Sequence, residues 1–297
     1  MNLMLGRATR VLQTRPETRQ QLKESYYSFR DATTPWHVVL PLALLALRRA
    51  PTHDEALLPL HLRAHLPPGS ASLLLPLCSQ LYWSWLLWFN TALALREHIL
   101  RVNGSAIRNW WIRHHYLSVA IILAVMTWPP GSAVWHAFTH RFWLWSAAQG
   151  GVFALQNQYQ RKRTYTRIAL GRASAMDVAS GEAAATSGQL RALFPALLAM
   201  QLAQAHTGAV CLAAGLRGLR AALSPDGGEA ARAAGRVLIA TPLEWQAGVV
   251  GCLFLVQAVG NLVSTYRSIA DKRRAGRREQ VAAAKQEAAA AYSQKSR

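Results

Sequence analysis

Long runs without a charged residue limit what this chain can fold into more than any other feature. The clearest runs extend from Ala71 to Leu95 and from Phe142 to Gln160. A helix needs about 20 mostly apolar residues to cross a lipid bilayer. Further apolar segments that complete the pattern lie at residues 32–49, 114–128, 192–216 and 245–266. The sequence therefore predicts an all-α integral membrane protein with six transmembrane helices.

The basic residues indicate how these helices are oriented. Of the 33 lysines and arginines, 25 fall on the side that holds both termini if the chain crosses six times. Cytoplasmic loops of membrane proteins are enriched in these residues, so both termini are predicted to be cytoplasmic. The net charge of +19 fits such loops and contact with anionic lipid headgroups better than it fits nucleic-acid binding.

Composition divides the chain into three parts. Residues 1–31 mix charged and apolar side chains, as an amphipathic or hinge segment on the membrane surface does. Residues 32–266 form the six-helix transmembrane domain. Residues 267–297 are a basic, alanine-rich cytoplasmic tail. The Asn103-Gly104-Ser105 sequence would be a glycosylation site in a lumenal loop, but on the cytoplasmic side it indicates a turn.

The stretch from Asn109 to Tyr116 holds the most informative side chains of the chain. Trp111 and His114 are three residues apart and share a helical face, whereas His115 is turned about 100° from His114. We therefore expect only one of the two histidines to share a surface with Trp111. Histidines there can act as nucleophiles or handle protons, which makes His114 and His115 candidate catalytic residues. The alternative is an interfacial aromatic belt with two ordinary polar residues.

A metal site has little support in the sequence. Adjacent histidines lack the spacing of a helical metal pair. The three cysteines lie apart from one another in apolar runs, so we expect them to be small buried residues. They are Cys78, Cys211 and Cys252. We therefore expect no metal.

Amides form a stripe in the run from Phe142 to Gln160. Gln149, Gln156 and Gln160 share one helical face. Amides within a membrane face a neighbouring helix or a wet cavity rather than lipid. The predicted cytoplasmic helix ends are rich in arginine and lysine, which would suit a phosphate-bearing ligand or simply set the topology.

The block Asn-Gly-Ser…Trp-Trp-x-x-His-His-Tyr within residues 97–116 resembles the transmembrane protein 120 family, also called TACAN. Further matches extend this resemblance over nearly all of residues 3–272. It implies a homodimer whose six helices form a barrel that opens to the cytoplasm and holds coenzyme A. It also implies a coiled coil before the barrel, yet no heptad pattern precedes Leu3, so the coiled coil is expected to be absent.

The implied fold is similar to that of very-long-chain fatty acid elongases, whose motif is His-x-x-His-His. Here Trp111 stands at the first histidine and His114 and His115 at the other two. Loss of that imidazole leaves elongase-like acyl transfer uncertain. Matching by position, the resemblance implies coenzyme A contacts at Trp111, His114, Phe142, Gln156, Asn103, Glu182, Arg267 and Lys272.

Three functions remain open at this point. The first is a membrane protein that binds coenzyme A or acyl-CoA in a cytoplasm-facing pocket, as a lipid-metabolism sensor or an acyl-transfer enzyme. The second is a mechanosensitive ion channel, although the sequence holds no acidic ring or filter-like loop. The third is a scaffold of the nuclear envelope or endoplasmic reticulum, the two membranes that the resemblance favours over the plasma membrane.

Overall fold

The computed structural model describes residues 15–49, 74–105, 107–129, 132–169, 171, 187–223 and 245–295. Within these ranges every regular element is a helix. The elements are α2 (Pro16–Thr33), α3 (Trp36–Arg49), α5 (Leu74–Val102), α6 (Asn109–Met126), α7 (Ala133–Ala169), α8 (Ser187–Leu223) and α10 (Trp245–Lys295).

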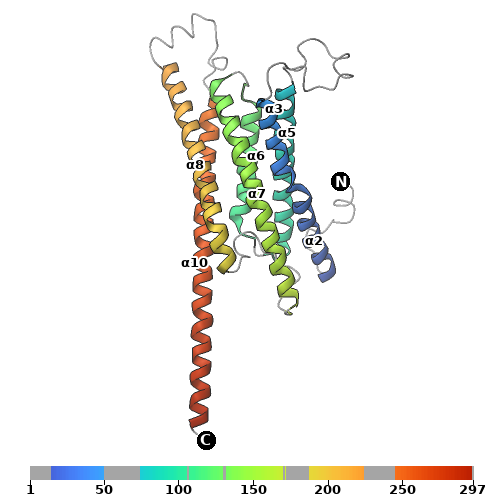
Figure 1. Ribbon diagram of the computed structural model, residues 1–297, viewed down its shortest axis with the longest axis vertical. Helices are drawn as coiled ribbons and strands as arrows, with labels where there is room; N and C mark the ends of the chain where they lie inside the picture. The colour runs from blue at the N-terminus through green and yellow to red at the C-terminus, as the bar shows by residue number, and fades with distance from the viewer. Residues whose placement is uncertain are drawn as a thin grey trace, which may run out of the picture.

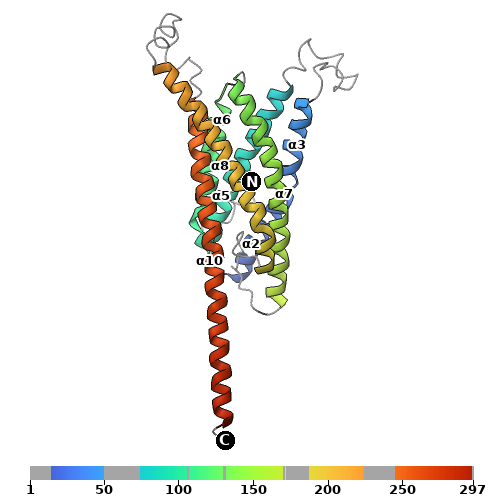
Figure 2. The same ribbon diagram turned by 60° about the vertical axis from the view of Figure 1, so that its left-hand side comes forward.

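Six of these helices pack in a closed ring. α3 packs against α5 and α7, α5 packs against α6, α6 against α10, α10 against α8, and α8 against α7. The helices run roughly along one direction, and both views show them side by side (Figures 1 and 2). The remaining helix, α2, packs against α5 and α7 at one end of the ring, the end beyond which α10 continues (Figure 1).

The turn after α5 has a defined helix-ending geometry. Gly104 adopts a positive φ of 96°, which glycine accepts without strain. The Gly104 N–H donates to the Arg101 carbonyl and the Ser105 N–H to the Leu100 carbonyl, both at 3.0 Å. These are the two hydrogen bonds of a Schellman motif, so the predicted turn is confirmed.

Small residues bring α8 and α10 close together. A Cβ atom added to Gly215 would lie 2.5 Å from the backbone nitrogen of Gly248. Any side chain at Gly215 would therefore force the two helices apart. Such close backbone approach is typical of helix pairs within membranes.

Apolar side chains cover the outside of the ring. Each ring helix exposes at least one large apolar residue, for example Val39, Leu81, Leu123, Leu144, Leu202 and Val259. Contiguous exposed apolar surface on this scale requires a lipid or protein environment. By length and composition two helices in the described part of the chain could cross a membrane, Leu193–Arg220 and Trp245–Asp271. These match the last two predicted spans, and the count of six remains a prediction.

Several helices extend beyond the apolar segments that the sequence predicted. α5 continues seven residues past Leu95, and α6 begins five residues before His114. Helices end where backbone hydrogen bonding ends, whereas apolar runs end at the first charge. For the same reason the predicted boundary at residues 266/267 falls inside the unbroken helix α10.

Candidate functional site

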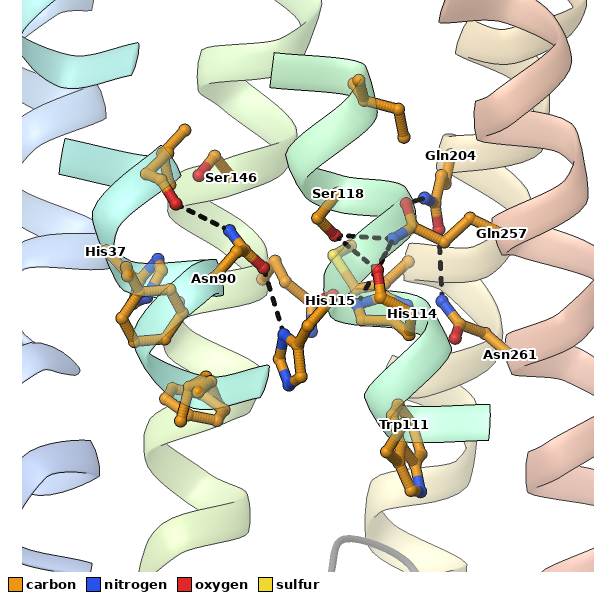
Figure 3. Close-up of a pocket in the computed structure, with 18 of the residues that line it drawn as sticks. His37, Asn90, Trp111, His114, His115, Ser118, Ser146, Gln204, Gln257 and Asn261 are labelled. Carbon is orange, nitrogen blue, oxygen red and sulfur yellow. Dashed lines mark hydrogen bonds between the residues drawn. The ribbon is translucent and has the colours of Figure 1, made fainter. Parts of the chain in front are cut away.

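A cavity of about 230 Å³ lies inside the ring, and all seven described helices contribute to its wall. Most of the lining is aromatic or aliphatic, with polar groups at a few places. The polar residues that line it are Arg30, His37, Asn90, Glu97, His114, His115, Ser118, Ser146, Gln149, Gln156, Gln201, Gln204, Gln257 and Asn261, together with the phenol of Tyr26. Figure 3 shows the part of this wall around the two histidines.

Both histidines of α6 face this cavity together with Trp111. The ring centroids of Trp111 and His114 are 5.7 Å apart, and those of His114 and His115 are 5.5 Å apart. The expectation that only one of the two histidines would share a surface with Trp111 is therefore wrong. Lining residues of α6 recur at intervals of three and four, through Ser118 to Ile122, and such a stripe is more than 100° wide.

An amide cluster, formed by Ser118, Gln204, Gln257 and Asn261, lies beside His114 (Figure 3). The Gln257 side-chain amide donates to the Ser118 hydroxyl at 2.7 Å and to the His114 backbone carbonyl at 3.1 Å. Its oxygen accepts from the Gln204 amide at 2.7 Å. This side of the wall is thus built from neutral donors and acceptors on α6, α8 and α10.

The His114 ring lies against the side-chain amides of Gln257 and Asn261 on α10. Its Nε2 lies 3.5 Å from the Gln257 amide nitrogen. Its Nδ1 is buried and has no hydrogen-bond partner within the described part of the chain. Buried polar atoms are nearly always hydrogen-bonded, so an unpaired one that lines a cavity indicates a place for a ligand atom or water.

An ionic cluster, formed by Tyr26, Arg30, Glu97 and His115, lies across the cavity. Arg30 Nη1 donates to the Gln160 amide oxygen at 2.7 Å and to the Tyr26 hydroxyl at 3.4 Å. The Tyr26 hydroxyl donates to Glu97 Oε1 at 3.1 Å, and His115 Nε2 lies 3.6 Å from the same oxygen.

Burial stabilises the neutral phenol of this cluster. Desolvation raises the pKa of Tyr26 well above its ordinary value, which outweighs the opposing effect of the nearby Arg30 charge. Tyr26 therefore keeps its proton and acts as a donor to Glu97. The chain of bonds joins α2 to α5, α6 and α7 through side chains that are almost fully buried.

Sequence reasoning missed three members of the ionic cluster, Tyr26, Arg30 and Glu97. Tyr26 and Arg30 are four residues apart on α2, so they could have been recognised as one helical face. Glu97 lies two residues after the apolar run that ends at Leu95, and together with Arg96 it was interpreted only as a charge that closes a span. Nothing local in the sequence links these two places.

Four of the eight predicted ligand contacts meet at the cavity, namely Trp111, His114, Phe142 and Gln156. Of the amide stripe, Gln149 and Gln156 also line it, and Gln160 is buried against Arg30. The other four lie elsewhere or outside the described ranges. Asn103 is buried in the turn after α5 and donates to the Ile99 carbonyl. Arg267 is exposed on α10, Lys272 belongs to α10, and Glu182 lies outside the described residues.

The part of the chain that the structure describes contains no candidate metal site. No three side chains among His, Cys, Asp and Glu come together there in a way that could hold an ion. Of the cysteines predicted to be buried, Cys211 on α8 is buried and Cys78 on α5 is half-buried, whereas Cys252 on α10 is exposed, so the prediction is wrong for Cys252. The cavity is thus best described by its imidazoles, amides and aromatic rings.

Fold and site define a class: an α-helical membrane protein whose helices surround a mainly apolar cavity with a few polar groups. Within this class, the sequence profile of the TMEM120A/B family matches residues 1–222. The chain belongs to this family, as its Trp-Trp-x-x-His-His-Tyr block indicated.

Individual relatives agree with this assignment. Transmembrane protein 120 homolog of Dictyostelium discoideum is 30% identical over 270 residues, which are 89% of this chain and 60% of that protein. Transmembrane protein 120B of Danio rerio and of Homo sapiens are each 39% identical over 93 residues, 31% of this chain and 27% of each relative. The chain spans less than two thirds of the length of these relatives.

Proposed function

We propose that the cavity binds coenzyme A or an acyl-CoA. The observation that carries the proposal is the His114 imidazole beside the ring of Trp111, in the same wall as Phe142 and Gln156, with a buried Nδ1 atom that has no hydrogen-bond partner among the described residues. These four residues are the ones to which the family resemblance assigns the ligand most directly. Their convergence from α6 and α7 supports the assignment.

The chemistry of the wall fits this ligand. Pockets for organic ligands are mostly apolar with a few placed polar groups, as this one is. Trp111 and Phe142 offer aromatic faces, and His114 and Gln156 offer hydrogen bonds. A cavity of about 230 Å³ would enclose only part of a molecule of this size, so the rest would extend toward the rim. Coenzyme A would supply a thiol that carries an acyl group as a thioester.

Binding is the core of the proposal, and turnover is a secondary form of it. Trp111 cannot handle a proton as a histidine would. An elongase-like acyl transfer would therefore depend on His114 and His115, the two remaining imidazoles at the cavity. A sensor of lipid metabolism needs no such step. A homodimer and a location in the nuclear envelope or endoplasmic reticulum are further proposals that rest on the family resemblance.

A channel has less support from this wall. Arg30 and Glu97 are the lining residues with a formal charge, and they belong to one bonded cluster. Conducting pores are usually lined by rings of like charge or of carbonyl oxygens. We therefore propose ligand binding rather than ion conduction as the function of this cavity.

Two measurements on the purified protein test the proposal. Mass spectrometry of the extracted small molecules should detect coenzyme A or acyl-CoA. Trp111→Ala should weaken coenzyme A binding by roughly tenfold, because a base stacked on an aromatic ring contributes about 1–3 kcal/mol. Trp245→Ala is the matched control, because Trp245 is half exposed at the start of α10 and does not line the cavity. Equal affinity in the wild type and Trp111→Ala, with no coenzyme A extracted, would refute the proposal.

A further inference from the structure

The protonation of His115 follows from its neighbour Asn90. The Asn90 amide nitrogen donates to the Leu86 carbonyl at 2.9 Å, which leaves its Oδ1 atom toward the imidazole (Figure 3). That oxygen lies 3.1 Å from His115 Nδ1 and can only accept. His115 Nδ1 therefore carries a hydrogen.

The other nitrogen of His115 shares one proton with Glu97. Nε2 faces Glu97 Oε1 at 3.6 Å. Without a proton between them, the lone pair of a neutral imidazole would face a carboxylate and repel it. One proton therefore resides on this pair, as an imidazolium with a carboxylate or as an imidazole with a carboxylic acid.

Both arrangements give the ionic cluster the same net charge. The Glu97–His115 pair is neutral in total, Tyr26 is neutral, and the Arg30 guanidinium is always protonated. The cluster thus carries +1. Protonation of His37 or His114, which also face the cavity, would only increase this charge. No other carboxylate lines the cavity within the described residues.

Arg30 is the residue that holds this charge, and the carboxyl group of Glu97 is reached from it only through the Tyr26 hydroxyl. Its side chain is 5% exposed, and its hydrogen bonds go to Gln160 and Tyr26, neither of which is charged. Its guanidinium also lies 4.7 Å from the centre of the Phe153 ring. Across the described part of the chain, no carboxylate oxygen comes within ion-pair distance of it. Burial of a charge without a counterion is costly, so an anion at this position would be strongly stabilised.

We propose that Arg30 is the headgroup site for a single-chain anionic amphiphile, such as the carboxylate of a long-chain fatty acid. The guanidinium fork matches the geometry of a carboxylate or phosphate. Phe153 contacts Arg30, and further apolar side chains of the same cavity wall would accept the hydrocarbon chain. These include Leu86, Phe89, Leu93 and Ile122. This site is separate in chemistry from the coenzyme A proposal and does not depend on it.

Binding of matched probes to the purified protein in zwitterionic nanodiscs tests the site. The probes are tritiated palmitate, hexadecyl phosphate and hexadecanol, which share one chain and differ in headgroup charge. The wild type should bind both anions more tightly than the alcohol. Arg30→Gln should weaken palmitate binding by at least roughly tenfold and leave hexadecanol unchanged, because a hydrogen bond to a charged group is lost.

Two further variants separate charge from folding. Arg30→Lys keeps the charge and should retain most of the palmitate affinity. Arg96→Gln removes a guanidinium that packs 3.9 Å from the Phe29 ring and does not line the cavity, so palmitate should bind as in the wild type. Equal affinity for palmitate and hexadecanol, or equal loss in Arg30→Gln and Arg96→Gln, overturns the proposal.

A coenzyme A titration on the same preparation keeps the two proposals apart. If palmitate binds through Arg30 while coenzyme A does not bind, the headgroup site stands and the proposed function fails. If coenzyme A binds while the three probes bind equally, the headgroup site fails and the proposed function stands.

Discussion

The two sides of the cavity wall satisfy their buried polar groups in opposite ways. The ionic cluster on α2, α5 and α6 uses formal charges linked through a phenol. The amide cluster on α6, α8 and α10 uses neutral donors and acceptors in short bonds of 2.7 Å. A neutral network loses only hydrogen bonds between uncharged groups when a member is removed, whereas a charged one is left with a buried charge. The two sides should therefore differ in how much damage a single substitution causes.

Glu97→Ala should have the largest effect. It removes the acceptor of the Tyr26 hydroxyl and the carboxyl group that shares a proton with His115. Removing one partner of a buried charged pair destabilises the folded state by about 3–5 kcal/mol, because the other charge stays buried without its partner. Denaturant titrations in detergent, followed by tryptophan fluorescence, would measure this loss in the free energy of unfolding. Glu24→Ala, at an exposed position on α2, is the control, and a similar loss in both variants would contradict the distinction.

Gln257→Leu should cost less, about 1–3 kcal/mol, because it leaves neutral groups unpaired. The groups that lose a partner are the Gln204 amide, the Ser118 hydroxyl and the His114 carbonyl. The same titration measures the loss, with Gln158→Leu at an exposed position of α7 as control. A loss equal to that of Glu97→Ala would mean that charge is not what separates the two sides.

Asp271→Asn tests whether an ion pair matters without burial. Asp271 pairs with Arg108 at 2.9 Å, but its side chain is 61% exposed. Exposed pairs contribute about 0.2–1 kcal/mol, and salt weakens them further. The free energy of unfolding should therefore change by less than 1 kcal/mol. If the free energy of unfolding fell by several kcal/mol instead, solvent exposure would not weaken the contribution of this ion pair to stability.

The smallest expected effect is the coupling between the two sides. The combination of Glu97→Ala and Gln257→Leu should be additive within about 0.5 kcal/mol, because the two residues share no partner. Glu97→Ala combined with Arg30→Gln should instead deviate by about 0.5–3 kcal/mol, because Tyr26 bonds to both residues. Strong coupling in the first pair would mean that the two histidines connect the clusters.

The sequence predicted those parts of the wall that depend on the pattern within a single helix. Amides such as Gln149 and Gln156 are costly inside an apolar run, so their periodicity alone indicated an inward face. Trp111 and His114 are linked by local spacing on α6. The error over His115 arose because 100° of rotation was treated as a different surface, whereas the inward face of α6 is that wide.

The ionic cluster could not be predicted in the same way. Tyr26 and Glu97 are 71 residues apart and Arg30 and Gln160 are 130 apart. Periodicity reports which face of a helix is buried but not which other helix covers it. A charge at the end of an apolar run has the same sequence pattern whether it faces solvent or a phenol, so only the packing of α2 on α5 and α7 reveals the cluster.

The unbroken course of α10 has a mechanical consequence. Asn261 contributes to the cavity wall, and the same helix continues to Lys295, beyond the ring (Figure 1). At about 1.5 Å per residue the intervening segment is about 50 Å long. A tilt of α10 by about 10° at the wall would move the far end by about 9 Å, for a rod of that length. Small rearrangements around Gln257 and Asn261 would thus be amplified into a displacement large enough to follow with a spectroscopic label near Lys295.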